Sequence, residues 1–142
     1  MGPGRPRAAP VQLRRDFRPP AARRVARARL YATALGLYEA HVNGRRVGTD
    51  RLAPGWTDYR KRVPYRTHDV TDLLRPGANA IGMLLAPGWY AGSVGRFGPH
   101  QYGEQPLLLA QLKVTYTDSG TDTVTTGPDW RCVTGPSRAR TC

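Results

Sequence analysis

The segment that decides the fold covers residues 37–47 and reads LYEAHVNGRRV. Tyr38, Ala40 and Val42 occupy every second position, and this period of two is typical of a β-strand with one buried face. Asn43-Gly44 follows at once, before the chain resumes. An Asn-Gly pair favours a tight hairpin, because a type I′ turn needs positive φ at both central residues. The segment therefore predicts a β-hairpin.

Working outward from this hairpin, the chain contains further short segments with strand-like patterns, separated by turn residues. Glycine (16) and proline (13) are frequent, which favours many turns over a helical bundle. The stretch from 30 to 34 alternates as a strand does, but it is rich in alanine, so a helix is the alternative prediction. We expect an all-β fold, a jelly-roll β-sandwich, with strands near 30–34, 38–42, 65–70, 79–85, 107–116 and 121–126.

The 142 residues suit one domain, flanked by two tails. Residues 1–24 contain five prolines and most of a one-sided Arg cluster, which predicts a disordered basic tail. Within it, only the alternating residues near 11–17 are compatible with an edge strand. We expect the sandwich over residues 25–135 and an irregular tail over 136–142.

The formal net charge is +12, and nine arginines lie in the first 30 residues. Such a cluster is compatible with a basic nucleic-acid-binding domain. Aromatic residues are sparse there and no nucleic-acid motif accompanies the charge, which favours a solvated tail. Cys132 and Cys142 leave a short disulfide loop open as an alternative.

No apolar run resembles a signal peptide or approaches the ~18 residues of a membrane helix. The sequence therefore predicts no membrane partner and leaves the localisation cytoplasmic or unknown. His41 and His68 fall on predicted strand faces, where we expect them to be solvated, and they do not form a zinc site.

Four blocks over residues 35–92 resemble the N-terminal accessory domain of bacterial α-L-rhamnosidases. Each block is weak alone, but all four occur in order, and a looser likeness extends over residues 12–135. The blocks are Gly-x-Tyr-x-x-x-x-Asn-Gly (36–44), Leu-Ala-Pro-Gly-Trp-Thr-Asp-Tyr (52–59), Asp-Val-Thr-Asp-Leu-Leu with Pro-Gly-x-Asn (69–79), and Gly-Trp-Tyr-x-Gly (88–92).

The resemblance implies a galactose-binding-like jelly roll that precedes a catalytic (α/α)6 barrel. Nothing in this chain resembles that barrel, so we expect no catalytic residues and no glycoside hydrolase activity in this chain alone. Residues 135–142 depart from the family pattern and read like a truncated end. The expected function is recognition of a rhamnosyl-containing glycoside, and the alternative is a purely structural domain that packs on the barrel.

Sugar-binding jelly rolls use aromatic rings that stack on the pyranose and polar groups that bind its hydroxyls. An alternative role for Trp56 is to anchor its loop on the sandwich. An alternative role for Trp89 and Tyr90 is to face the catalytic barrel. We expect Trp130 to be a core residue, and we expect no cofactor. In some family members, the acid matching Asp50 helps to bind Ca²⁺, but Arg51 follows it here. The predicted substrate-binding residues are Asp50, Trp56, Tyr59, Trp89, Tyr90, Arg96 and Tyr102.

Overall fold

The computed structural model describes residues 9–134 and 139–141. None of the helical segments in these ranges is long and apolar enough to cross a membrane. The elements in chain order are β1 (Val11–Phe17), β2 (Val25–Leu35), β3 (Leu37–Val42), β4 (Arg45–Arg46), β5 (Arg66–Asp69), the 3-10 turn η1 (Thr71–Leu73), β6 (Asn79–Ala86), α1 (Gly88–Ala91), the 3-10 turn η2 (Gly95–Phe97), β7 (Leu107–Tyr116), β8 (Thr121–Thr125), β9 (Arg131–Thr134) and β10 (Ala139–Thr141).

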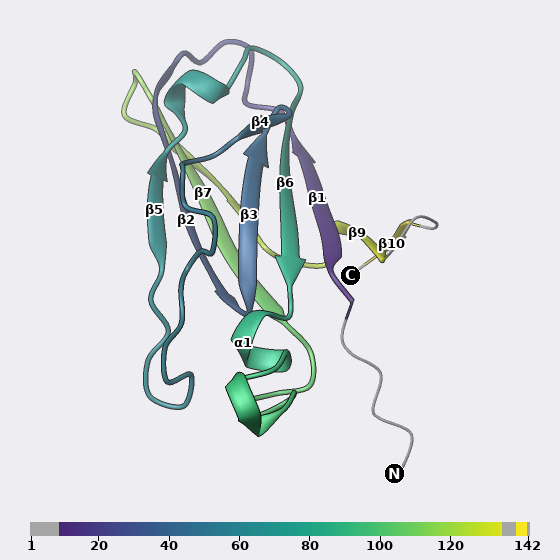
Figure 1. Cartoon of the computed structure of the whole chain (residues 1–142). Coiled ribbons are helices and arrows are strands. Elements are labelled where there is room, and N and C mark those ends of the chain that lie inside the picture. The colour runs from purple at the N-terminus through teal and green to yellow at the C-terminus, as the bar shows by residue number, and fades with distance from the viewer. Residues whose placement is uncertain (1–8, 135–138, 142) are drawn as a thin grey trace.

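The strands form two antiparallel sheets that pack face to face (Figure 1). One sheet has the order β10-β9-β1-β6-β3-β4, and the other has the order β5-β2-β7-β8. Strands that are neighbours in a sheet are often distant in sequence, as β1 and β6 are. This architecture confirms the predicted all-β sandwich.

The predicted boundary at residue 25 is wrong, because β1 lies inside the six-stranded sheet. It pairs with β6 on one side and with β9 on the other. Its inward side chains include Leu13 and Phe17, which pack against the core. The charged residues that suggested a tail, such as Arg14 and Asp16, project outward from the same strand. The alternation of inward and outward side chains is therefore a better guide to this strand than the local density of charge.

The predicted irregular tail over residues 136–142 is also corrected in part. β10 pairs with β9 within this range. Residues 1–8, 135–138 and 142 lie outside the described residues, and so does Cys142 of the candidate disulfide.

The core forms where the inner faces of the two sheets meet. The inward side chains of β2 are small, with Ala28, Ala32 and Ala34 beside Leu30, and all four are buried. β2 pairs with β7 along most of its length, and this excludes the helix that its alanines allowed. Trp130 is 2% exposed, which confirms it as a core residue, and its indole Nε1 donates to the Thr125 carbonyl oxygen at 2.9 Å.

The predicted hairpin joins β3 to β4 through Asn43 (φ 51°) and Gly44 (φ 78°), as a type I′ turn requires. The Asn43 side chain also reaches beyond the turn. Its Nδ2 donates to the Leu73 carbonyl at 2.9 Å and to Asn79 Oδ1 at 2.8 Å, while its Oδ1 accepts the Ala80 N–H at 2.9 Å. The turn is thereby bound to the segment that leads into β6.

Asn79 is 3% exposed and is the one buried polar residue in the described part of the chain. Its Oδ1 also accepts the Arg75 N–H at 2.9 Å. Its Nδ2 donates to the carbonyl oxygens of Arg75 at 2.8 Å and Gly77 at 2.9 Å. Every donor and acceptor of the buried amide is therefore satisfied, as a polar group in a core requires.

We expect Asn79→Leu to lower the free energy of unfolding by about 3 kcal/mol or more, because it leaves several buried backbone and side-chain groups without partners. Urea denaturation followed by circular dichroism measures this change. The control is Gln111→Leu, the same exchange at an exposed position of β7, which should change stability by less than about 0.5 kcal/mol. Equal effects for the two variants would contradict this role for Asn79.

Candidate functional site

Two long connections meet at one end of the sandwich. One runs from 47 to 65, between β4 and β5, and the other runs from 87 to 106, between β6 and β7. Figure 1 shows both at the lower end, where α1 lies below the strands. These connections carry all seven predicted site residues, and the fold brings three of them, Tyr59, Tyr90 and Tyr102, into ring contact although they are up to about 40 positions apart in the sequence.

Three predicted site residues form an aromatic cluster where the connections meet. The ring centroids of Tyr59 and Tyr90 lie 5.3 Å apart, and those of Tyr59 and Tyr102 lie 5.1 Å apart, both edge to face. The Arg60 guanidinium lies over the Tyr102 ring at 5.3 Å from its centroid and donates to the Gln101 carbonyl oxygen at 3.1 Å. These contacts fix the two connections against each other.

The tyrosine cluster is tightly packed. A Cβ at Gly103 would collide with the Tyr90 ring, so a side chain at this position would displace that ring. The Tyr59 hydroxyl is buried without a hydrogen-bond partner among the described residues. Burial raises the pKa of this phenol, and the neighbouring Tyr102 adds to the shift. The tyrosine cluster is therefore a rigid, mostly apolar support for the two connections.

Other aromatic rings at this end are open to solvent. Trp56, three residues before Tyr59, is 58% exposed, and Trp89 of α1 is partly exposed. Phe97 is 78% exposed at the tip of the second connection. Sequence reasoning missed Phe97, although its place in a glycine-rich loop was a usable signal. Arg96 beside it is exposed and has no ion-pair or hydrogen-bond partner within the described ranges.

Asp50 has partners outside the tyrosine cluster. Its Oδ2 lies 3.7 Å from Arg66 Nε, and its carbonyl oxygen accepts Arg46 Nη2 at 2.7 Å. The described residues contain no group of three or more His, Cys, Asp or Glu side chains that would hold a metal ion. Two arginine side chains beside Asp50 disfavour a Ca²⁺ ion, which needs several oxygen ligands, so this donor set does not fit calcium.

His68 is half-buried, and the expectation that it is solvated is wrong. Its Nε2 lies 3.3 Å from the Tyr38 hydroxyl, and a Cβ at Gly48 would touch its ring. Burial lowers the pKa of His68, Asp50 opposes this shift, and Arg66 adds to it. Burial also raises the pKa of Tyr38 to about 12. Sequence reasoning missed this pair because only the tertiary fold covers His68.

The arginines near the N-terminus do not share one face. Arg14 projects from β1 in one sheet, whereas Arg27 and Arg29 project from β2 in the other. Arg15 and Arg23 form ion pairs with Asp129 and Asp118, both at 2.9 Å. The described residues of the cluster therefore lack the continuous basic face that the nucleic-acid-binding hypothesis requires.

The comparisons with known proteins agree with this architecture. Residues 23–142 match the family described as the α-L-rhamnosidase N-terminal domain. The chain is 67% identical over 135 residues to an α-L-rhamnosidase of Streptomyces avermitilis, a match that covers 92% of this chain and 13% of the relative. It is 40% identical over 133 residues to an α-L-rhamnosidase of Alteromonas sp. (strain LOR), covering 92% of this chain and 14% of that protein. The chain thus spans about an eighth of the length of these curated relatives.

Solved structures give the same result. The crystal structure of the S. avermitilis α-L-rhamnosidase complexed with L-rhamnose superposes with a TM-score of 0.87 at 67% identity, over 91% of this chain and 12% of that one. An α-L-rhamnosidase from Aspergillus terreus gives 0.86 at 42% identity, over 94% of this chain and 16% of that one. A lectin from Pleurotus ostreatus in complex with GalNAc gives 0.60 at 14% identity, over 91% and 32%, and this likeness shows the fold alone.

We expect Tyr59→Phe to leave the free energy of unfolding unchanged or to raise it by up to about 1 kcal/mol, because the lost hydroxyl has no partner. The matched control is Tyr116→Phe, since the Tyr116 hydroxyl donates to Asp122 Oδ2 at 2.6 Å. That variant should lose about 1–3 kcal/mol in urea denaturation. A comparable loss in Tyr59→Phe would show that its hydroxyl is hydrogen-bonded.

We expect the stability of the protein to fall as the pH is lowered from about 7.5 to 5.5. The pKa of His68 is lowered in the folded state, so the unfolded chain takes up this proton first and is favoured as the pH falls through the ordinary histidine value. In urea denaturation across this range, His68→Gln should reduce the fall, whereas His41→Gln should keep it. An unchanged pH dependence in His68→Gln would refute this coupling.

Proposed function

The chain belongs to the α-L-rhamnosidase N-terminal domain family, and from this premise we propose that it is a substrate-recognition domain that binds rhamnosyl-containing glycosides. Hydrolysis is then the task of a catalytic barrel elsewhere in the enzyme, and this chain contributes binding. The observation that carries the proposal is the aromatic end of the sandwich, where a packed tyrosine cluster adjoins exposed aromatic rings.

Stacking on these rings supplies the main contact in this proposal. Trp56 and Phe97 present ring surface to solvent on the two connections that meet at this end, and Trp89 presents part of its indole. The apolar face of a 6-deoxy pyranose, extended by its methyl group, suits such rings. The tyrosine cluster holds the loops in place before the ligand arrives, which limits the entropy lost on binding.

Polar groups at this end orient the sugar. The Arg96 guanidinium has free N–H donors for hydroxyl oxygens. Asp50, on the connection that carries Trp56, is an acceptor for a sugar hydroxyl that extends toward β5, where Arg66 lies beside its carboxylate. So few contacts correspond to a dissociation constant between about 1 mM and 1 µM, or roughly −4 to −8 kcal/mol.

A second role, packing on the catalytic barrel, is supported by a different surface. The outer face of the four-stranded sheet exposes Leu107 (58%) and Leu109 (64%), and Tyr65 (66%) contributes to the same face beside Tyr31. An apolar face of this kind suits contact with another domain. The two roles use separate surfaces and are compatible.

The test is titration of the 142-residue chain with L-rhamnose, followed by tryptophan fluorescence. We expect a saturable change, because Trp56 and Trp89 are accessible whereas Trp130 is buried. Trp56→Ala and Trp89→Ala should each raise the dissociation constant about tenfold or more, equal to at least ~1.4 kcal/mol.

The matched control is Tyr65→Ala, which removes an exposed aromatic ring from the outer face of the four-stranded sheet. This variant should bind L-rhamnose as the wild type does. Circular dichroism establishes that each variant is folded. If the folded wild type does not respond, or if Tyr65→Ala weakens binding as much as Trp89→Ala, sugar recognition at this end is refuted and domain packing is the better role.

A further inference from the structure

The outer face of the six-stranded sheet carries one cross-strand row of basic residues that a glycine interrupts. The register places Arg131 of β9 beside Arg14 of β1, and Arg14 beside Gly82 of β6. On the other side of Gly82 lies His41 of β3, followed by Arg46 of β4. Directly opposed residues in antiparallel strands project from the same face, so these five positions lie in one line on the outer surface of the sheet.

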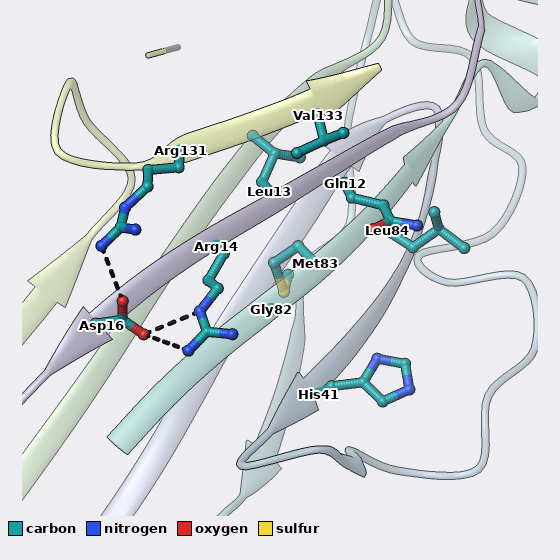
Figure 2. A pocket seen from close by; sticks show the side chains of 10 residues that line it. All are labelled: Gln12, Leu13, Arg14, Asp16, His41, Gly82, Met83, Leu84, Arg131 and Val133. Carbon is teal, nitrogen blue, oxygen red and sulfur yellow. Dashed lines mark hydrogen bonds and ion pairs between the residues drawn. The ribbon is translucent and has the colours of Figure 1, made fainter. Parts of the chain in front are cut away.

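The missing side chain at Gly82 opens a hollow in this row. The hollow has a volume of about 740 Å³ and crosses β9, β1, β6 and β3 (Figure 2). The nearest atom to a Cβ built on Gly82 is the Leu13 carbonyl oxygen at 3.9 Å, so no atom obstructs the space above Gly82 at the bottom of the hollow. Since neighbouring strands lie about 4.8 Å apart, Arg14 and His41 flank a gap of roughly 10 Å. One sugar ring fits between them.

The walls of the hollow carry more positive than negative charge. Asp16 is shared by Arg14 Nη2 at 2.8 Å and Arg131 Nη2 at 3.1 Å, and both guanidiniums extend toward it in Figure 2. Beside the hollow, Glu39 pairs with Arg46 at 3.2 Å and with His41 at 3.3 Å. Among the residues that line the hollow, Arg14 and Arg131 against Asp16 leave a surplus of one positive charge.

The guanidiniums of Arg14 and Arg131 also have N–H donors that Asp16 does not occupy. The side chains of Arg14 and Arg131 are 64% and 69% exposed, and each uses only part of its five-donor fork on Asp16. A planar fork of this kind pairs with a carboxylate through two parallel hydrogen bonds. This end of the hollow therefore suits a carboxylate.

The adjacent row supplies apolar and amide contacts. The register aligns Val133, Gln12 and Leu84 across β9, β1 and β6. Leu84 is 40% exposed, which is unusual for a leucine in the middle of a central strand, and it forms one wall of the hollow (Figure 2). A surface that combines an apolar wall, an amide and arginines matches a sugar ring that bears an acid group.

We propose that this hollow, the Gly82 groove, binds a uronate unit of an acidic saccharide. The carboxylate pairs with Arg14 and Arg131, the ring lies over Gly82, and its apolar edge contacts Leu84. This site goes beyond the proposed function, since it lies on a sheet face rather than at the aromatic loops and takes an anionic sugar rather than a deoxy sugar. It does not depend on rhamnose binding.

The experiment is isothermal titration of the full 142-residue chain with α-1,4-linked trigalacturonate. We expect saturable binding to one site. Gly82→Val fills the groove and should lower affinity by about tenfold or more, which equals ~1.4 kcal/mol. This variant should fold, because its side chain projects into open space on a strand. Arg14→Gln should also weaken binding, by about fivefold or more.

Two controls separate this site from general charge attraction. Arg29→Gln removes the same charge from an exposed position on the opposite sheet and should leave the affinity within about twofold. Neutral α-1,4-galactotriose, which has the same linkage without carboxylates, should not bind measurably. The L-rhamnose response of Gly82→Val should match that of the wild type, so the two sites fail or succeed separately.

Three results would overturn the proposal. They are no binding of trigalacturonate to the folded chain, equal affinity in wild type and Gly82→Val, or an equal loss of affinity in Arg29→Gln and Arg14→Gln. Galactotriose that binds as tightly as trigalacturonate would refute the role assigned to the carboxylate.

Discussion

The contact between the side-chain amides of Asn43 and Asn79 is the interaction on which the rest of this structure depends. It joins the β3–β4 turn to the first residue of β6, and Asn43 also exchanges hydrogen bonds with the Ala80 backbone. β6 lies between β1 and β3, so the position where it starts sets the register on both sides. Because Asn79 is buried and the hydrogen-bonding groups of both side-chain amides are satisfied, the pair specifies one arrangement, and any slip of β6 would leave several polar groups unpaired.

That register determines which side chains lie together on the outer face of the six-stranded sheet and at the end where α1 lies. On the outer face it aligns Gly82 with Arg14 and His41. At the end of β6 it delivers the chain into α1, where Tyr90 meets Tyr59 from the other connection. The proposed binding surfaces are thus a sheet face and a pair of loops, held by one rigid scaffold.

Part of the candidate site was predictable from local pattern. The aromatic residues of the two connections stand out in the sequence, and the structure joins three of them, Tyr59, Tyr90 and Tyr102. Asp50 instead pairs with Arg66, which sequence reasoning did not connect to it. Phe97 was missed because its exposure depends on the path of a loop. Residues 11–17 were allowed only as an edge strand within a tail, because their outward charges masked a strand that lies between β6 and β9.

By itself, the sequence determined most of the strands between residues 25 and 126, the Asn43-Gly44 hairpin and the family, since alternation, turn chemistry and ordered motifs are local properties. Only the tertiary structure decided which distant segments became neighbours. Arg14, Gly82 and Arg131 form one row because long-range backbone hydrogen bonds align β1, β6 and β9. A local pattern can state which side of a strand a residue faces, but the pairing of strands that are far apart in the chain depends on how the whole core packs.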